Sequence, residues 1–187
     1  MLGFQDEILE SLLLLMKTKG FNDISVSELC RKAGVSRMTY YRNYNRKEEV
    51  ITRHLDTLFD QYVKEILALT FKTPYDFSIK FFSYFEPERT LIQCLARSRM
   101  ESLILGCFER YLELIFQNLF GYTLLEMGLR RFEIEFISGG LYKTLIAWSL
   151  SESPPSVQQM ATLVDGFLAP GPTPVSVDRD LAQGTNI

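Results

Sequence analysis

The sequence predicts an all-α protein built in two parts. Apolar residues recur at spacings of three and four along most of the 187-residue chain, which is the periodicity of helices with one buried face. Gly20, Gly34, Pro74 and Pro154 interrupt these stretches, and such residues mark helix ends. Residues 25–47 fit two short helices joined by a tight turn. Together these observations predict a three-helix N-terminal domain followed by a larger helical domain.

Composition limits the class of protein. Apolar residues make up 47% of the chain and charged residues 23%, which is typical of soluble globular proteins. No apolar run approaches the roughly 18 residues that a membrane span needs, and Asp6, Glu7 and Glu10 contradict a secretory signal. The three cysteines are an odd number without C-x-x-C spacing, which argues against a disulfide framework or a zinc site. We expect a cytoplasmic protein with no membrane partner, no metal and no cofactor. A redox-sensing thiol is the alternative to cysteines that fill the core.

The N-terminal domain begins with a helix expected near residues 3–19, which ends at Gly20. Four apolar residues of the next helix are expected to form one buried face: Val26, Leu29, Cys30 and Ala33. Gly34 follows, and glycine best tolerates the positive φ at which a helix ends and the chain reverses. Ser36 suits the N-cap of a further helix, because its hydroxyl accepts from first-turn N–H groups. This order predicts a helix-turn-helix, whose second helix enters the DNA major groove.

The second helix of this motif has two different faces. Tyr40 and Tyr44 lie four residues apart and are expected to pack inward. Four residues share the outward side: Arg37, Met38, Tyr41 and Arg42. Residues 31–53 hold seven Lys and Arg against two Glu, a local charge of +5 in a chain whose net charge is -3. A basic stripe on an acidic protein favours phosphate binding, with a solvated helix face as the alternative. We therefore expect this segment to bind DNA.

An enzyme is the alternative from another class of protein. His54 is the only histidine, so no second histidine completes a metal pair, and no Ser or Cys near it lies in a known nucleophile context. The sequence also lacks a G-x-x-x-x-G-K-[ST] loop and a G-x-G-x-x-G that follows a strand. We therefore expect no enzymatic activity and no catalytic residue.

Residues 25–50, SVSELCRKAGVSRMTYYRNYNRKEEV, resemble the DNA-binding domain of the TetR family of bacterial transcriptional regulators. The family's pattern reads roughly T-x-x-x-I-A-x-x-A-G-V-S-x-x-T-L-Y-x-H-F-x-x-K-x-x-L. The resemblance implies that Tyr41 and Lys47 contact phosphates. It also implies that base edges are read by Ser27, Arg37, Met38 and Thr39. Asn43 departs from the usual histidine and can still donate to a phosphate oxygen. The full set of expected DNA-binding residues is Ser25, Ser27, Ser36, Arg37, Met38, Thr39, Tyr41, Arg42, Asn43 and Lys47.

Five further helical stretches are expected after the helix-turn-helix. A long helix near 46–70 carries one apolar stripe: Ile51, Leu55, Leu58, Tyr62, Ile66 and Leu69. Thr73-Pro74 and Glu86-Pro87 leave a short helix between them. The expected helical ranges are then 75–85, 88–120, 123–151 and 156–168. The tail has no periodic apolar face and is expected to be loose. We therefore expect a DNA-binding domain over 1–50, a ligand-binding and dimerisation domain over 51–169, and a flexible tail over 170–187.

The helix over 129–151 is apolar on more than one side, so it must be covered all round. A second copy of the chain is one cover, and a central helix of a monomeric core is the alternative. Gly139 and Gly140 in its interior favour a close approach by another helix. The TetR resemblance implies a four-helix dimer interface made by the last two long helices. Segment 132–148 also resembles the C-terminal domain of a subgroup that includes activators of dihydroxyacetone kinase operons. The expected interface residues are Ile137, Leu141, Leu145, Trp148, Leu163 and Phe167.

Ten of the fourteen phenylalanines lie within residues 71–136. They form either a plain core or the lining of an apolar ligand pocket between helices. The TetR resemblance implies a small effector in this region, which we expect to be apolar or amphipathic. An anionic ligand held by Arg89, Arg97 and Arg99 is an alternative. The residues expected to line the pocket are Phe81, Phe85, Phe108, Phe116, Phe132 and Phe136.

The resemblance implies a homodimeric regulator, expected to be a repressor that a small-molecule effector releases from a double-stranded DNA operator. Two alternatives stay open, each without a small-molecule ligand. One is a helix-turn-helix co-regulator that acts through a protein partner, and the other is an activator.

Overall fold

The computed structural model describes residues 3–69, 73–120 and 130–168, and this part of the chain is helical without strands. The predicted all-α fold class is therefore confirmed. No helix among these residues has the length and apolarity required to cross a membrane. The elements are α1 (Phe4–Met16), the 3₁₀ turn η1 (Phe21–Asp23), α2 (Val26–Lys32), α3 (Arg37–Asn43), α4 (Glu48–Leu67), α5 (Pro74–Phe85), α6 (Arg89–Arg97), α7 (Ser102–Phe120), α8 (Arg130–Leu150) and α9 (Val157–Leu168).

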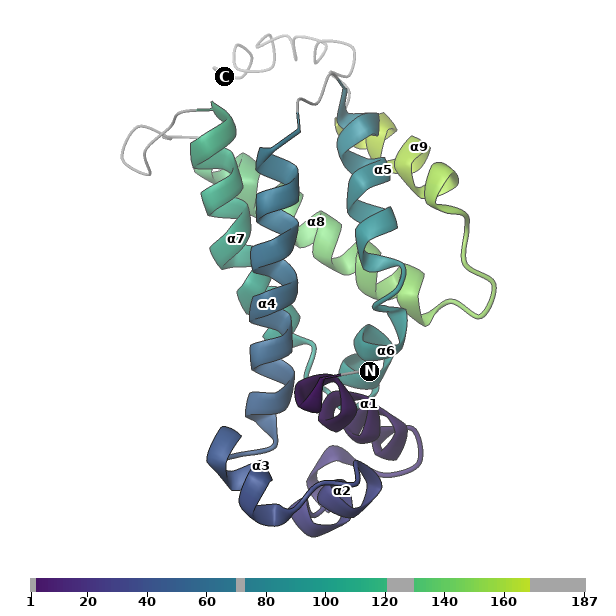
Figure 1. Ribbon diagram of the computed structural model, residues 1–187. Helices are drawn as coiled ribbons and strands as arrows, with labels where there is room; N and C mark the ends of the chain where they lie inside the picture. Colours follow the sequence, from purple (N-terminus) through teal and green to yellow (C-terminus); the bar gives the residue numbers. More distant parts are fainter. Residues whose placement is uncertain (1–2, 70–72, 121–129, 169–187) are drawn as a thin grey trace, which may run out of the picture.

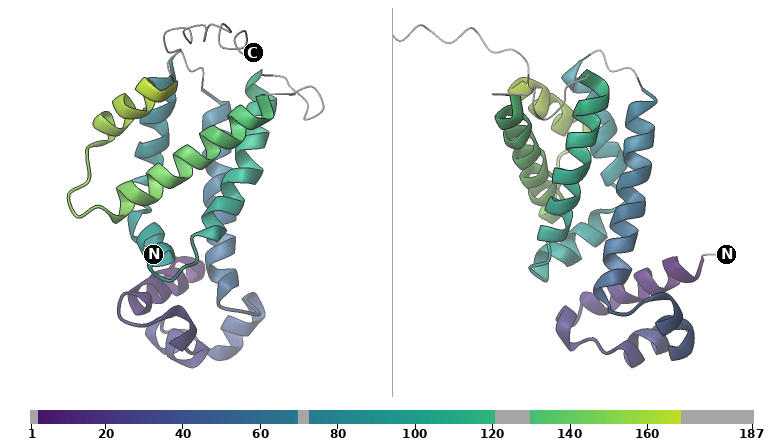
Figure 2. Two further views of the ribbon diagram at one scale, coloured as in Figure 1. Left: turned by 180° about the vertical axis from the view of Figure 1, so that it is seen from behind. Right: turned by 90° about the vertical axis from the view of Figure 1, so that its left-hand side faces the viewer.

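The helices form a small N-terminal layer and a larger C-terminal bundle that share α4 (Figure 1). Helices α1, α2 and α3 lie at the base, and α4 rises from them into the upper part. Helix α7 packs along α4, α8 crosses the back of the bundle, and α9 packs on α5 (Figure 2). Helix α6 contacts both α1 and α8, so it joins the two layers a second time.

Most of the predicted helices are present, with shifted ends. The expected helix over 88–120 is two helices, because a turn after Arg97 separates α6 from α7. Arg99 in that turn has a φ of 56°, and its neighbour Met100 donates to the Leu95 carbonyl at 2.8 Å, as at a helix C-terminus. The expected start of the 123–151 helix and the tail over 170–187 lie outside the described residues. The proposed division at residue 50 falls inside α4, which belongs to both layers.

A single apolar core runs from α1 to α9. The predicted stripe of α4 is buried at Ile51, Leu55, Tyr62 and Ile66, whereas Leu69 lies beyond the helix and is 44% exposed. Above them, three aromatic rings form the centre of the bundle. Phe81, Phe85 and Phe108 are each 1% exposed, with centroids 5.1 to 6.1 Å apart.

The buried face of α8 belongs to the protomer's own core. Leu141, Leu145 and Trp148 are 3%, 0% and 3% exposed. The Trp148 ring lies 5.3 Å from that of Phe82, and its indole N–H donates to the Pro155 carbonyl at 2.8 Å. Leu145 and Trp148 therefore lie in the protomer's own core, contrary to the prediction that they form a dimer interface. Leu141 is also buried, but it lines a groove on the open side of α8 as well. Helices α6 and α7 pack against α8, and Phe82 of α5 contacts the Trp148 ring.

The opposite face of α8 is open in the protomer. Phe132 and Phe136 are 69% and 82% exposed, and Leu163 and Phe167 on α9 are 49% and 77% exposed. A Cβ added at Gly140 would meet no atom within 4 Å, so no helix of the same protomer approaches it closely. Ile137 is half-buried at the edge of this face. Of the six predicted interface residues, Ile137, Leu163 and Phe167 are thus free to meet a partner.

Candidate nucleic-acid interface

Helix α2 is closed at both ends by residues that the sequence singled out. The Ser25 hydroxyl caps its N-terminus by accepting from the Glu28 N–H at 3.1 Å. Beyond its C-terminus, Gly34 has a φ of 69°. Val35 N–H donates to the Cys30 carbonyl at 3.0 Å, and Gly34 N–H donates to the Arg31 carbonyl at 3.4 Å. This pair of bonds is a Schellman motif, and it turns the chain sharply toward α3.

Helix α3 begins with the predicted serine cap. The Ser36 hydroxyl accepts from the Thr39 N–H at 3.0 Å, and the two hydroxyl oxygens lie 2.8 Å apart. Both side chains therefore hold the first turn of α3, with Ser36 exposed and Thr39 half-buried. The free N–H groups of that turn point away from the helix body, a direction from which a phosphate can approach.

The two faces of α3 are as predicted. Tyr40 and Tyr44 are 0% and 2% exposed, and their ring centroids lie 5.5 Å apart. Burial raises the pKa of Tyr40 to about 12, so its hydroxyl remains protonated near neutral pH. On the outward side Met38 is 74% exposed and Tyr41 is 50% exposed. The Arg37 guanidinium lies 5.9 Å from the Tyr41 ring centroid, so α3 presents a cation, an aromatic ring and a thioether together.

Besides the capping residues, two more of the predicted DNA-binding residues are bonded within the protein. The Asn43 amide donates to the Thr39 carbonyl at 2.8 Å. The Lys47 ammonium donates to the Phe21 carbonyl at 2.8 Å and also to the Ile24 carbonyl, and it lies 4.7 Å from the Phe21 ring centroid. Lys47 thus ties the start of α4 to η1, between α1 and α2. Because its partners precede it by 23 and 26 residues, no local sequence signal revealed this role.

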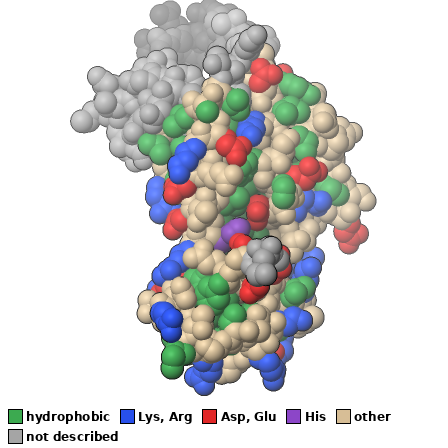
Figure 3. Space-filling model, in the orientation of Figure 1, with side chains coloured by type: hydrophobic (Ala, Val, Ile, Leu, Met, Phe, Trp, Pro, Cys, Tyr) green, Lys and Arg blue, Asp and Glu red, His purple; other side chains and the backbone are tan. Residues whose placement is uncertain are grey.

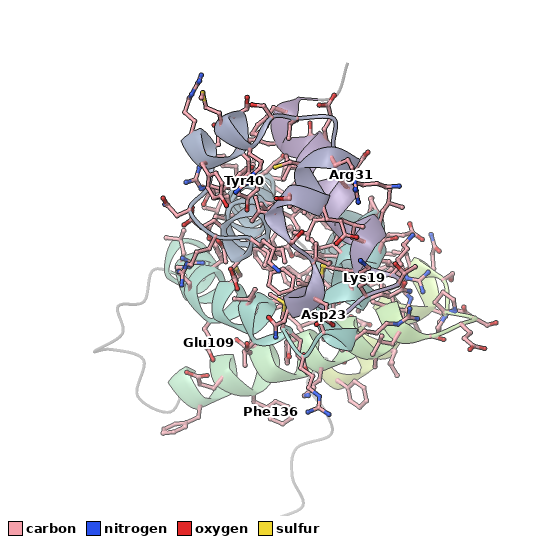
Figure 4. All side chains as sticks on the ribbon, turned by 90° about the horizontal axis from the view of Figure 1, so that it is seen from below. Lys19, Asp23, Arg31, Tyr40, Glu109 and Phe136 are labelled. Carbon is pink, nitrogen blue, oxygen red and sulfur yellow. The ribbon has the colours of Figure 1, made fainter. Side chains whose placement is uncertain are left out.

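The basic residues of this layer face solvent around α2 and α3 (Figure 3). Arg31, Lys32, Arg37, Arg42 and Arg46 are exposed, and none of them makes an ion pair with another residue in the described part of the chain. In contrast, Lys19 pairs with Glu28 at 2.6 Å and Arg53 with Glu49 at 3.3 Å. Figure 4 views this end of the molecule, with Arg31 at its edge and Tyr40 among the helices. The five unpaired cations leave a positive surface for an anionic partner.

The predicted phenylalanine pocket does not form as one group. Phe81, Phe85 and Phe108 contact one another in the bundle core, as described above. Phe132 and Phe136 lie on the open face of α8, and Figure 4 shows Phe136 pointing outward. The side chain of Phe116 lies outside the described residues. The sequence pattern did not separate the two sets, because phenylalanine occurs in a core and on an apolar surface alike.

The three thiols are poorly placed for redox chemistry. Cys30, Cys94 and Cys107 are all buried. Burial raises the pKa of each thiol, which disfavours the reactive thiolate form. These cysteines therefore act as small core residues, the simpler of the two sequence interpretations.

Lys47 provides a test of the internal bonding in this layer. We expect Lys47→Met to lower the free energy of unfolding by about 1–3 kcal/mol, because two buried carbonyls lose a charged donor. Arg46→Met, at an exposed neighbour without an ion pair, should change it by less than about 0.5 kcal/mol. Urea denaturation followed by circular dichroism measures both. Unchanged stability of Lys47→Met, with weaker DNA binding, would instead favour the phosphate contact implied by the family resemblance.

Comparison with known proteins gives structural likeness without close sequence similarity. No protein-family model and no curated protein matches the sequence. Among solved structures, the fatty acid degradation regulator FadR from Bacillus halodurans has a TM-score of 0.67 at 17% identity, over 89% of this chain and 95% of that one. A transcriptional regulator of the TetR/AcrR family from Aquifex aeolicus VF5 has a TM-score of 0.63 at 19% identity, over 89% and 98%.

A third similar structure is the dihydroxyacetone kinase operon activator DhaS. Its TM-score is 0.60 at 15% identity, over 88% of this chain and 93% of that one. All three are helical transcription regulators, and the likeness covers both layers of the molecule. At these levels of identity the comparison establishes the architecture, and the chain has the fold of TetR/AcrR-type transcription regulators.

Proposed function

We propose that this protein is a TetR-type transcription regulator that binds a double-stranded DNA operator through α2 and α3. The outward face of α3 is the observation that carries the proposal. It places Arg37, Met38, Tyr41 and Arg42 in solvent on a helix whose other face is fully buried. Such a rigid helix, preceded by a glycine turn, fits the major groove. A DNA-binding role also accords with the expected cytoplasmic location.

The residues around α3 fall into two groups, one placed to contact DNA phosphates and one placed to contact bases. Cations at the rim, such as Arg31 and Lys32 on α2, are positioned to neutralise phosphates, which gives affinity for any sequence. Side chains at the N-terminal part of α3, such as Arg37 and Met38, are exposed and suit contacts with base edges. Ser27, which is exposed on α2, is a further candidate for such a contact.

Substitution of a base-contacting residue and of a phosphate-contacting residue should therefore change DNA affinity in different ways. We expect Arg37→Ala to relax base preference at one position and to cost about 1–3 kcal/mol on the preferred site, if Arg37 binds guanine with two hydrogen bonds. Lys32→Ala should weaken binding to all sequences alike and lower the slope of affinity against salt by about one ion. Affinities for a selected and a scrambled duplex across a salt series separate these effects. Equal losses on both duplexes for Arg37→Ala would exclude a base contact.

A homodimer is the second part of the proposal. The open face of α8 and α9 contains a groove of about 360 Å³ lined by Phe136, Ile137, Gly140, Leu141, Thr144, Val164 and Phe167. An apolar surface of this kind is unusual on a monomer and typical of an interface between chains. Gly140 leaves room beside Phe136 for a ring from a second copy. A two-fold dimer also matches regulators that bind two half-sites of one operator.

Charge placed on this face should separate the protomers without unfolding them. We expect Phe136→Asp to give a folded monomer, because the ring is 82% exposed in the protomer and an aspartate there would be buried only on dimerisation. Leu69→Asp, at a similarly apolar residue that is 44% exposed outside this face, should leave the dimer intact. Sedimentation equilibrium at micromolar concentration is the measurement. A monomeric unmodified protein would disprove the assignment.

We further propose that the protein is a repressor that an apolar or amphipathic effector releases from DNA. Tyr62 supports a ligand in the aromatic core. Its hydroxyl is buried without a hydrogen-bond partner among the described residues, and burial raises its pKa well above the usual value of 10, so it remains a donor. Buried unpaired hydroxyls are costly, and a ligand acceptor would satisfy this one. The tight packing of Phe81, Phe85 and Phe108 favours the alternative of a ligand-independent co-regulator or activator.

The effector proposal predicts reciprocal coupling. With dodecanoate as an amphipathic probe, we expect DNA affinity to fall by a factor between about 5 and 150, and ligand affinity to fall by the same factor on DNA. Tyr62→Phe should weaken ligand binding while DNA affinity without ligand stays unchanged, because only the hydroxyl is lost. Calorimetric titration with and without DNA measures both quantities. Equal dodecanoate affinity in the two titrations would exclude this class of effector.

A further inference from the structure

A second cavity lies between the two layers, away from the aromatic core and the α8–α9 face. It has a volume of about 430 Å³ and is walled by α1, by His54 on α4 and by the corner between α5 and α6. Volumes from about 300 Å³ upward accommodate small organic ligands. The site thus combines sufficient space with walls from both layers of the molecule.

The floor of this cavity is apolar. Leu9 and Leu91 are 7% and 1% exposed, and Leu13 packs beside them half-buried. Leu14, at the mouth, is 49% exposed. Since α6 also touches α1 through the Cys94 thiol and the Leu13 carbonyl, 3.7 Å apart, the floor is continuous across the layers. Because Leu9 and Leu91 are already almost excluded from water, an aliphatic chain would gain mainly by covering the exposed parts of Leu13 and Leu14.

The rim of the cavity is acidic. Asp6, Glu10 and Glu88 line it, against one lysine, Lys17. His54 Nε2 lies 3.3 Å from the Glu88 carboxylate and joins α4 to the start of α6. Figure 3 shows the histidine in purple with carboxylates beside it, at the waist of the molecule. The helical rise places Lys17 about 10 Å beyond Glu10 along α1, so the lysine stands at the far end from Asp6 and Glu10.

The carboxylates differ in how far they are already satisfied. Asp6 accepts from the Gly3 N–H at 3.1 Å, and Glu88 faces His54. Glu10 has no hydrogen bond or ion pair with any residue of the described chain. An ammonium group placed beside Glu10 would therefore gain a charged partner without breaking a bond within the protein.

We propose that this cavity binds a primary alkylammonium ion, with the ammonium group at Glu10 and Glu88 and the alkyl chain over Leu13 and Leu14, above the buried floor of Leu9 and Leu91. The occupant touches α1 on one side and α6 on the other, so its binding is linked to the relative position of the two layers. The inference concerns a site separate from the DNA-binding face and does not depend on DNA binding.

The test uses hexylammonium and the full-length protein with labelled leucine methyl groups, without DNA. We expect saturable shifts of the Leu13 and Leu14 methyl resonances in NMR titrations, with the Leu145 methyls in the bundle core unchanged. Hexanol and hexanoate have the same chain without the positive charge, and they should bind more weakly or not at all. Hexylammonium binding with the strength of hexanol would overturn the proposal, as would the absence of saturable shifts at these leucines.

Variants that each remove one carboxylate test which carboxylates bind the ammonium group. Glu10→Gln and Glu88→Gln should each weaken hexylammonium binding about two- to fivefold, the size expected for one partly solvated ion pair. Glu7→Gln changes the same charge on the same helix outside the cavity, and it should leave the affinity unchanged. Equal affinity in the Glu10, Glu88 and Glu7 variants would contradict the assigned site.

Discussion

Helix α4 buries one face along its whole length against both groups of helices. Seven of its side chains are buried, from Val50 at its first turn to Ile66 at its last. Burying one such side chain contributes about 1.5–3 kcal/mol, while the net stability of a domain is about 5–15 kcal/mol. Loss of this one helix from the core would therefore unfold both layers. The position of α2 and α3 relative to the bundle depends on this burial.

Polar contacts then fix how α4 meets each layer. Lys47 donates from its N-terminus to the Phe21 and Ile24 carbonyls at η1, and His54 faces Glu88 at the start of α6. Higher up, the Tyr84 hydroxyl donates to the Leu58 carbonyl at 2.9 Å, and Arg110 on α7 pairs with Asp56 at 2.9 Å. A helix held by apolar burial and by directional bonds at several heights moves as one body. A ligand-dependent change in the bundle therefore has a physical connection to α3.

The helix-turn-helix was predictable because its signals are local. Gly34 and Ser36 act within a few residues of their partners, and the structure has the turn and the cap where the sequence placed them. Ser25, which the sequence suggested only as a DNA-binding residue, also caps α2. Helix α8 was harder, because a helix that is apolar all round does not indicate which side faces its own bundle. Leu145 and Trp148 face the core, and Phe136 faces outward. That choice depends on α5, α6 and α7, which no single stretch of sequence specifies. The role of Lys47 and the cavity around His54 likewise arise from residues distant in sequence.

In the proposed function, two copies of α3 held together by the dimer bind the two half-sites of one DNA operator. Selection of bound duplexes from a random pool, followed by footprinting of the enriched sequence, tests it most directly. We expect an inverted repeat whose half-site centres lie about 10 base pairs, or a multiple of that, apart. Enrichment of a sequence without two-fold symmetry, or no enrichment over the starting pool, would contradict it.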